Sequence, residues 1–264
     1  MIRIGPVGWT HPRLAELWPA DRGPGFDPLR FLGERFGCVE VDVTAVALPQ
    51  RARVAAWLTA LDAAPRTRLS VRLPDTLLSE ADPTRAATGA REALAPLLGR
   101  PGLGALVARQ SAGALYGPSE LRRLLAASQV LRRVPLVLEA QHASWYGCAA
   151  RDAVRGAGWT LAHVDVGDRW DAPPRSHAPE AGGRAMLRIL GPGPLESARI
   201  TALVETIVSL DRTAREVLVV VAHTGGADDA LDRLHTALAL KRALAPSVII
   251  PPWPELSAAI EHRR

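Results

Sequence analysis

Short apolar runs alternate with amphipathic segments along the whole chain, and this alternation limits the possible folds more than any other feature. Eight runs have the length and composition of buried β-strands, and helical patterns separate them. Buried strands joined by helices pair in parallel, because each helix returns the chain across the sheet. The predicted strands are residues 2–5, 39–43, 68–73, 103–108, 136–139, 159–166, 184–189 and 217–222.

Eight strand–helix units in 264 residues predict an α/β fold with a (β/α)8 TIM-barrel-like architecture. An open doubly wound sheet is the alternative, but the junction GPVGW at residues 5–9 lacks the Gly-x-Gly-x-x-Gly nucleotide fingerprint. We expect a single domain over residues 1–245. Residues 246–264 are expected to form a Pro-rich tail whose short helix packs on the barrel.

Charge and cysteine usage narrow the class of protein. The net charge is +5, and Lys241 is the only lysine among 32 basic residues. A GC-rich genome explains this composition, and so does affinity for phosphates or nucleic acid. Cys38 and Cys148 fit no metal-ligand spacing and indicate a reducing compartment. We see no secretory leader and no long apolar segment, and therefore expect a cytoplasmic protein without a membrane partner.

Polar side chains stand at the predicted carboxyl ends of several strands, which is where barrel enzymes place their working residues. The strand at residues 136–139 ends on Glu139, and His142 and Trp145 follow it. In a barrel this segment would meet the other strand ends at one mouth. Those strand ends carry Glu40, Asp42, Arg72, Arg109, Asp165, Arg188 and His223.

Glu139, His142 and Asp165 are the predicted catalytic residues, and the same three would coordinate a divalent metal. A carboxylate and an imidazole at one strand end suit zinc, manganese or iron, and such a metal would activate water. In the other interpretation, Glu139 pairs with an arginine and His142 is a loop histidine bonded to the backbone. The cofactor is therefore unknown, with a divalent metal as the candidate.

A further set of strand-end residues is predicted to bind a ligand. Arg72 and Arg188 would hold a phosphate or carboxylate through paired N–H donors, or each would neutralise a buried carboxylate. Trp145 would stack on a ring or base, or would fill the barrel rim. The predicted ligand-binding residues are Glu40, Asp42, Arg72, Trp145, Arg188 and His223.

Ordered motifs over roughly residues 2–245 resemble the YecE-like family, also called domain-of-unknown-function family 72. The resemblance implies a TIM-barrel-like fold and no established activity. The matching motifs are IRIG and GW within residues 2–9, F-x-x-VEVD-x-T at 36–44, LP at 48–49, VR at 71–72 with Pro74, E-x-x-H-x-SWY at 139–146, Asp165, Arg188 with Gly191, and TGG at 224–226.

The chain departs from the family pattern at several polar and aromatic positions, so it resembles a divergent member. Ala45 and Val46 replace an aromatic pair, Gln141 replaces an arginine, and Leu190 replaces a histidine. Two functions follow. The protein binds a phosphate-bearing ligand, a nucleotide or nucleic acid, at the strand carboxyl ends and acts as a metal-assisted hydrolase. Alternatively, it is a non-catalytic barrel that serves as a scaffold for a protein partner.

Overall fold

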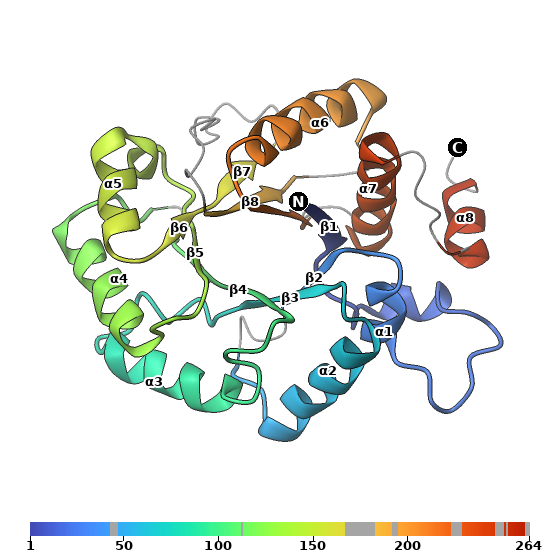
Figure 1. Ribbon diagram of the computed structural model, residues 1–264, viewed down its shortest axis with the longest axis horizontal. Helices are drawn as coiled ribbons and strands as arrows, with labels where there is room; N and C mark the ends of the chain where they lie inside the picture. The colour runs from blue at the N-terminus through green and yellow to red at the C-terminus, as the bar shows by residue number, and fades with distance from the viewer. Residues whose placement is uncertain are drawn as a thin grey trace.

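The structure is a computed structural model that describes residues 1–42, 47–111, 113–166, 183–191, 195–222, 229–245, 251 and 253–261. Parallel strands occupy the centre of the molecule and helices surround them (Figure 1). One sheet has the order β2-β3-β4-β5-β6 and the other has the order β1-β9-β8-β7. The strands are β1 Ile2–Pro6, β2 Cys38–Val41, β3 Arg68–Arg72, β4 Leu103–Arg109, β5 Leu136–Glu139, β6 Thr160–Leu161, β7 His163–Asp165, β8 Arg184–Ile189 and β9 Glu216–Val221.

The predicted α/β fold with parallel strands is confirmed, but the described strands form two hydrogen-bonded sheets and not one closed eight-stranded sheet. The predicted single strand at residues 159–166 is wrong, because it divides into β6 and β7 at Ala162. There the Ala162 N–H still donates to Leu138 O of β5 at 2.8 Å, whereas His163 already pairs with Leu187 of β8. On the other side, an isolated parallel bridge between Val7 and Glu40 links the two sheets.

Two of the helices begin at an aspartate that caps them. Asp27 and Asp82 each accept a hydrogen bond from the backbone N–H three residues later, at 2.8 and 3.0 Å, and each precedes a proline in the first turn. Two short 3₁₀ helices, η1 Pro12–Glu16 and η3 Ala143–Tyr146, were not predicted. The α-helices are α1 Pro28–Gly33, α2 Arg51–Ala63, α3 Pro83–Leu94, α4 Pro118–Val130, α5 Cys148–Gly156, α6 Ser197–Asp211, α7 Asp229–Leu244 and α8 Pro254–Glu261.

The strands bury both of their faces, as parallel strands covered by helices do. One face packs against the helices and contributes to the large core cluster. The opposite face forms a second cluster of mostly small apolar side chains. Because side chains alternate, Arg184, Met186 and Arg188 of β8 share this second face, which we call the inner face. On this face of β8, the buried Met186 therefore lies between Arg184 at the start of the strand and Arg188 near its end.

The first two strands approach each other unusually closely at Gly5. A Cβ atom built on Gly5 would lie 1.6 Å from the backbone oxygen of Cys38, so no other residue fits there. Close to this point, Gly37 N donates to Ile4 O at 3.0 Å and Gly8 N donates to Glu40 O at 2.8 Å. Gly5 thus keeps β1 beside β2 and helps to set the position of Glu40.

The C-terminal segment contacts the N-terminal part of the chain. The Trp253 ring stacks on Trp18 with a centroid separation of 5.7 Å, and Leu256 of α8 is buried. Residues 246–250 lie outside the described residues, and the division into a domain and a tail stays a prediction. None of the helices in the described residues is both long enough and apolar enough to span a membrane.

Candidate functional site

Charged side chains from three strands meet on the inner face near the strand carboxyl ends. Arg188 of β8 pairs with Glu40 of β2 through Nη1 and with Glu139 of β5 through Nε. All three side chains are at least 97% buried, with exposed fractions of 2%, 0% and 3%. We call these three residues the carboxylate–arginine unit. It joins strands of both sheets through one guanidinium.

Within the unit, the negative carboxylates offset the cost of burying the positive Arg188 guanidinium. Burial alone would lower the pKa of Arg188, but the negative charges of Glu139 and Glu40 and their hydrogen bonds outweigh burial and raise it. Arg188 therefore stays charged. Of the Glu40 carboxylate oxygens, Oε2 accepts from Arg188, while Oε1 has no hydrogen-bond partner among the described residues. Two buried carboxylates facing one arginine leave the unit with a formal charge of −1.

Arg109 supplies a second cation beside this unit. It is the last residue of β4 and is the register partner of Glu139, the last residue of β5. Its Nε lies 3.4 Å from Glu139 Oε1, and its side chain is 36% exposed. With the Gln141 amide oriented so that its oxygen faces Arg109, that oxygen accepts from Nε at 2.8 Å and from Nη2 at 2.5 Å. Together the four charged residues have a formal charge of zero.

The identity of residue 141 matters for Arg109. The family resemblance predicts an arginine at this position, and an arginine would place a second positive charge next to the Arg109 guanidinium. Gln141 instead offers a neutral carbonyl oxygen that accepts two hydrogen bonds from it. The departure from the family pattern thus supports Arg109 in a partly exposed position beside Glu139.

Two more predicted site residues have internal ionic partners. Arg72 donates from Nη2 to both carboxylate oxygens of Asp75, at 2.8 and 2.9 Å. Asp165 pairs with Arg199 of α6. Both arrangements match the interpretation in which strand-end charges neutralise one another. Arg199 was not among the predicted site residues, because nothing in a helical pattern shows which strand end a helix side chain will reach.

His142 and Trp145 belong to the loop that follows β5, and both are held by local bonds. His142 Nδ1 accepts from Ser144 N at 3.1 Å and lies 2.9 Å from Ser144 Oγ, so His142 caps η3. The Trp145 ring is fully buried, and its Nε1 donates to Ala114 O at 2.8 Å. In this structure Trp145 packs in the core and presents no face to a ligand.

The remaining predicted residues are Asp42 and His223. Asp42 is partly exposed, and its carboxylate lies against Gly8, where a Cβ atom would stand 3.0 Å from Oδ2. Gly8 also has a φ of +73°, so glycine is favoured there for two reasons. His223 lies outside the described residues.

The proposed metal ligands Glu139, His142 and Asp165 do not form a coordination shell in the described part of the chain. No group of three or more His, Cys, Asp or Glu side chains there is placed to hold a metal ion. Glu139 faces Arg188 and Arg109, His142 faces Ser144, and Asp165 faces Arg199. The described donors therefore do not fit a divalent metal, and we derive no metal-assisted step.

Comparisons with known proteins agree on one family. The sequence model of the family described as "Protein of unknown function DUF72" matches residues 3–256. A DUF72 family protein from Enterococcus faecalis V583 has a similar structure, with a TM-score of 0.79 and 18% identity, over 96% of this chain and 98% of that chain. A DUF72 family protein from Thermotoga maritima MSB8 has a TM-score of 0.73 and 19% identity, over 92% of this chain and 99% of that chain. No curated protein matches the sequence.

Proposed function

The chain belongs to the DUF72 family, whose function is unknown, and we propose that it binds a small phosphate-bearing ligand, such as a nucleotide or a nucleic-acid phosphate, at the carboxyl ends of its strands. In this proposal the strands surround a TIM-barrel-like mouth and the ligand sits over the carboxylate–arginine unit. The observation that carries the proposal is the partly exposed Arg109 guanidinium beside the buried unit.

Arg109 is better placed than Arg188 to contact an anion. Arg188 is 2% exposed and is engaged by two carboxylates, so it has no free side for a ligand. Arg109 uses Nε and Nη2 for Gln141, and within the described residues nothing accepts a hydrogen bond from Nη1. A phosphate oxygen would accept from Nη1 in the geometry that makes arginine a common phosphate ligand.

The carboxylate–arginine unit supports this site by fixing Glu139. A buried ion pair gives little net stability compared with apolar residues of similar volume, so stability alone does not account for its presence. Glu139 holds Arg109 on one side through Oε1 and Arg188 on the other through Oε2. The unit would thus keep the Arg109 guanidinium in place before a ligand arrives, which lowers the entropic cost of binding.

One observation favours the non-catalytic scaffold as the second candidate. Arg188, Arg72 and Asp165 each have an ionic partner inside the protein, so the strand-end charges compensate one another without any ligand. A barrel end of this kind would be structural, and function would then reside in a surface that binds a protein partner. The two candidates differ in whether the wild-type protein binds phosphate compounds at this end.

We expect Arg109→Ala to weaken binding of adenosine monophosphate by roughly tenfold or more, because one charge-assisted hydrogen bond contributes about 1.5–3 kcal/mol. Isothermal titration calorimetry measures the change. Arg109→Lys keeps the charge but loses the planar fork, so its affinity should lie between the two. Arg91→Ala removes the same charge from an exposed site on α3 and is the matched control.

Equal affinity of the wild type and Arg109→Ala would show that Arg109 does not contact the ligand. Failure of the wild type to bind adenosine monophosphate would leave the scaffold as the better account. In that case a partner recovered with the wild type should still bind Arg109→Ala.

A further inference from the structure

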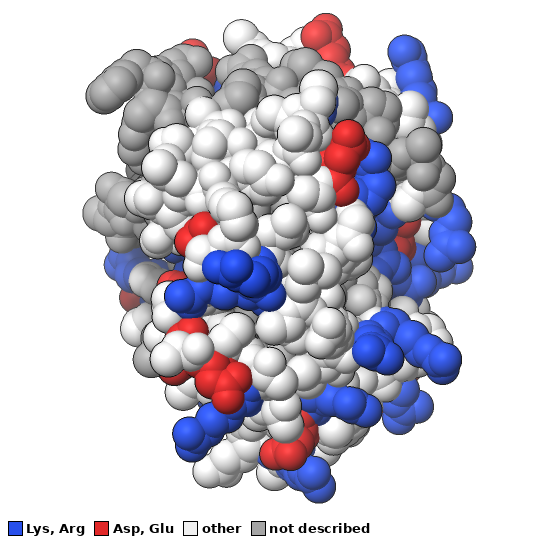
Figure 2. Space-filling model, turned by 90° about the vertical axis from the view of Figure 1, so that its left-hand side faces the viewer, with Lys and Arg blue, Asp and Glu red and all other residues white. Residues whose placement is uncertain are grey.

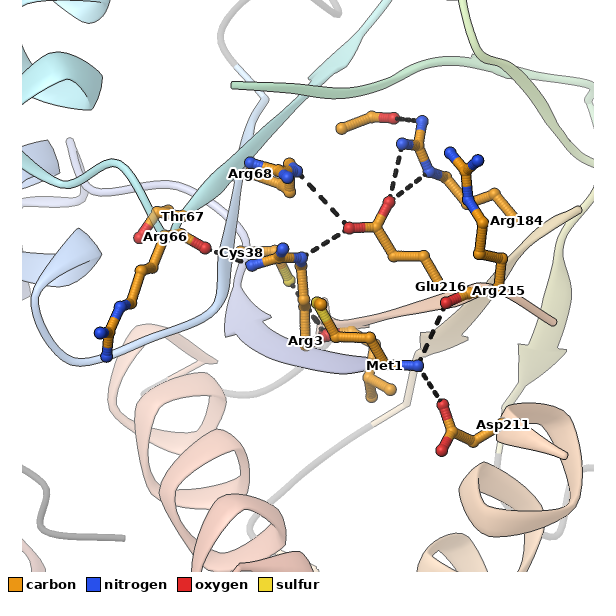
Figure 3. Close-up of polar contacts among 12 residues, drawn as sticks. Met1, Arg3, Cys38, Arg66, Thr67, Arg68, Arg184, Asp211, Arg215 and Glu216 are labelled. Carbon is orange, nitrogen blue, oxygen red and sulfur yellow. Dashed lines mark hydrogen bonds and ion pairs between the residues drawn. The ribbon is translucent and has the colours of Figure 1, made fainter. Parts of the chain in front are cut away.

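A second group of charged residues lies on the inner face at the opposite, amino ends of the strands (Figure 3). Arg3, Arg68, Arg184 and Glu216 come from β1, β3, β8 and β9. Glu216 Oε1 accepts from Arg3 Nε at 2.6 Å and lies 3.5 Å from Arg68 Nε. Its Oε2 lies 2.7 Å from both Nε and Nη2 of Arg184. One carboxylate therefore serves three guanidinium groups, and we call these four residues the amino-end cluster.

The amino-end cluster is partly open to solvent. The exposed fractions are 11% for Arg3, 20% for Arg68, 22% for Arg184 and 11% for Glu216. A hollow of about 540 Å³ lies over the cluster. Its volume falls within the range of small-ligand sites. A second hollow of about 410 Å³ shares Arg184 and Glu216 with the first, so the open space continues along the cluster.

Three more arginines line the hollow from connecting segments. Arg100, Arg133 and Arg215 are exposed, and no acidic side chain in the described ranges pairs with them. The lining thus holds six arginines and one acidic residue, Glu216. The N-terminal amino group also lies at its edge but is neutralised by Asp211 at 2.5 Å. The hollow has an excess of positive charge that the acidic side chains in the described part of the chain do not balance.

The directions in which the pKa values of Arg68 and Glu216 are shifted agree with this excess of positive charge. Burial lowers the pKa of Arg68, and the positive charges of Arg3 and Arg184 lower it further, while Glu216 offsets only part of the effect. Burial alone would raise the pKa of Glu216, but hydrogen bonds from Arg3 and the charge of Arg184 outweigh burial and lower it. The guanidiniums repel one another, and an added anion would relieve that repulsion.

We propose that this amino-end hollow is a binding site for an anion that carries two or more linked phosphate groups. Arginine presents a planar fork of donors that matches phosphate oxygens, and six guanidinium groups line the space. Arg184 directs its donors at Glu216 and Gly104 O, so the exposed arginines offer the more open forks. The inner arginines, held by Glu216, would bind one phosphate group, and the exposed Arg100, Arg133 and Arg215 would bind the next. The site is separate from the carboxyl-end site, because the inner apolar layer that includes Met186 and Leu218 lies between them.

The shape of the amino-end hollow favours a compact anion over a long nucleic acid. On the face shown in Figure 2, basic side chains lie in separate groups over the middle of the view and closer together along its right-hand edge. A protein that follows a nucleic-acid backbone needs a basic stripe or groove that extends over several phosphates. The amino-end hollow instead gathers its arginines around a single concave site.

Calorimetric titration with inorganic tripolyphosphate tests the proposal. We expect the wild type to bind and Arg100→Ala/Arg133→Asn to bind roughly a hundredfold more weakly, about tenfold for each charged hydrogen bond lost. Asparagine is chosen at residue 133 because its φ is 64°, a left-handed conformation that asparagine tolerates. Arg91→Ala/Arg122→Ala removes two exposed arginines from α3 and α4 and should bind like the wild type.

Arg109→Ala lacks the phosphate contact proposed for the carboxyl-end site, and it should retain the tripolyphosphate binding that Arg100→Ala/Arg133→Asn loses. The proposal is overturned if the wild type does not bind tripolyphosphate, or if Arg100→Ala/Arg133→Asn binds it equally well. It is also overturned if Arg109→Ala alone abolishes binding, because the anion would then sit at the other end. Loss of adenosine monophosphate binding in Arg109→Ala bears only on the carboxyl-end site.

Discussion

Replacing Arg188 with methionine is expected to lower the free energy of unfolding by about 3–5 kcal/mol, the usual cost of removing one partner from a buried ion pair. Glu40 and Glu139 would then face each other without a counter-ion, and their exposed fractions are only 0% and 3%. Methionine is unbranched, apolar and somewhat smaller than arginine, so the loss would report mainly charge and not packing.

Urea unfolding of the wild type and Arg188→Met measures this difference. The triple variant Glu40→Gln/Glu139→Gln/Arg188→Met carries no formal charge in the unit and should recover much of the lost stability. Arg91→Met changes an exposed arginine in the same way and should alter stability by less than about 0.5 kcal/mol. If Arg188→Met were as stable as the wild type, the two carboxylates would not depend on Arg188.

Replacing Glu216 with glutamine is expected to lower the free energy of unfolding by about 2 kcal/mol at pH 7, less than for Arg188 because solvent reaches the amino-end cluster. Glutamine keeps the size and one acceptor oxygen but leaves Arg3, Arg68 and Arg184 without a negative charge. Thermal unfolding at several pH values measures the effect.

The stability that Glu216 contributes should depend on pH. The folded protein lowers the pKa of Glu216, so the unfolded chain binds its proton more readily. The stability from Glu216 is therefore fully present above the unfolded pKa of about 4.3 and is lost as the pH falls through the lower folded value. The difference between the wild type and Glu216→Gln should shrink below about pH 4. A difference that stayed constant from pH 7 to pH 3 would contradict the assigned role.

Much of the fold followed from local patterns, and the exceptions have physical reasons. Apolar runs bounded by Gly, Pro and charged residues marked the strands well, and an Asp-Pro pair stands at the start of both α1 and α3. The division at Ala162 was not predictable, because alanine carries no break signal. The chain pairs with β5 up to Leu161 and with β8 from His163 onward, and this change of partner is a property of the tertiary arrangement.

The sequence indicated which residues stand at strand ends but not which of them pair. Glu139, Glu40 and Arg188 were expected at one mouth, and the structure brings these three together. Their pairing leaves Arg109, which was also expected at a strand end, as the partly exposed cation beside Glu139. Arg68, Arg184 and Glu216 each begin a strand, but nothing in the sequence shows that the first residues of three separate strands meet at one carboxylate.

A crystal structure of the protein grown with adenosine monophosphate tests the carboxyl-end site most directly. We predict phosphate density within hydrogen-bond distance of the Arg109 guanidinium, with Arg188 still held between Glu40 and Glu139. An adenosine monophosphate molecule bound only elsewhere, or a carboxyl-end mouth that stays empty at a concentration that saturates binding in solution, would contradict the proposed function.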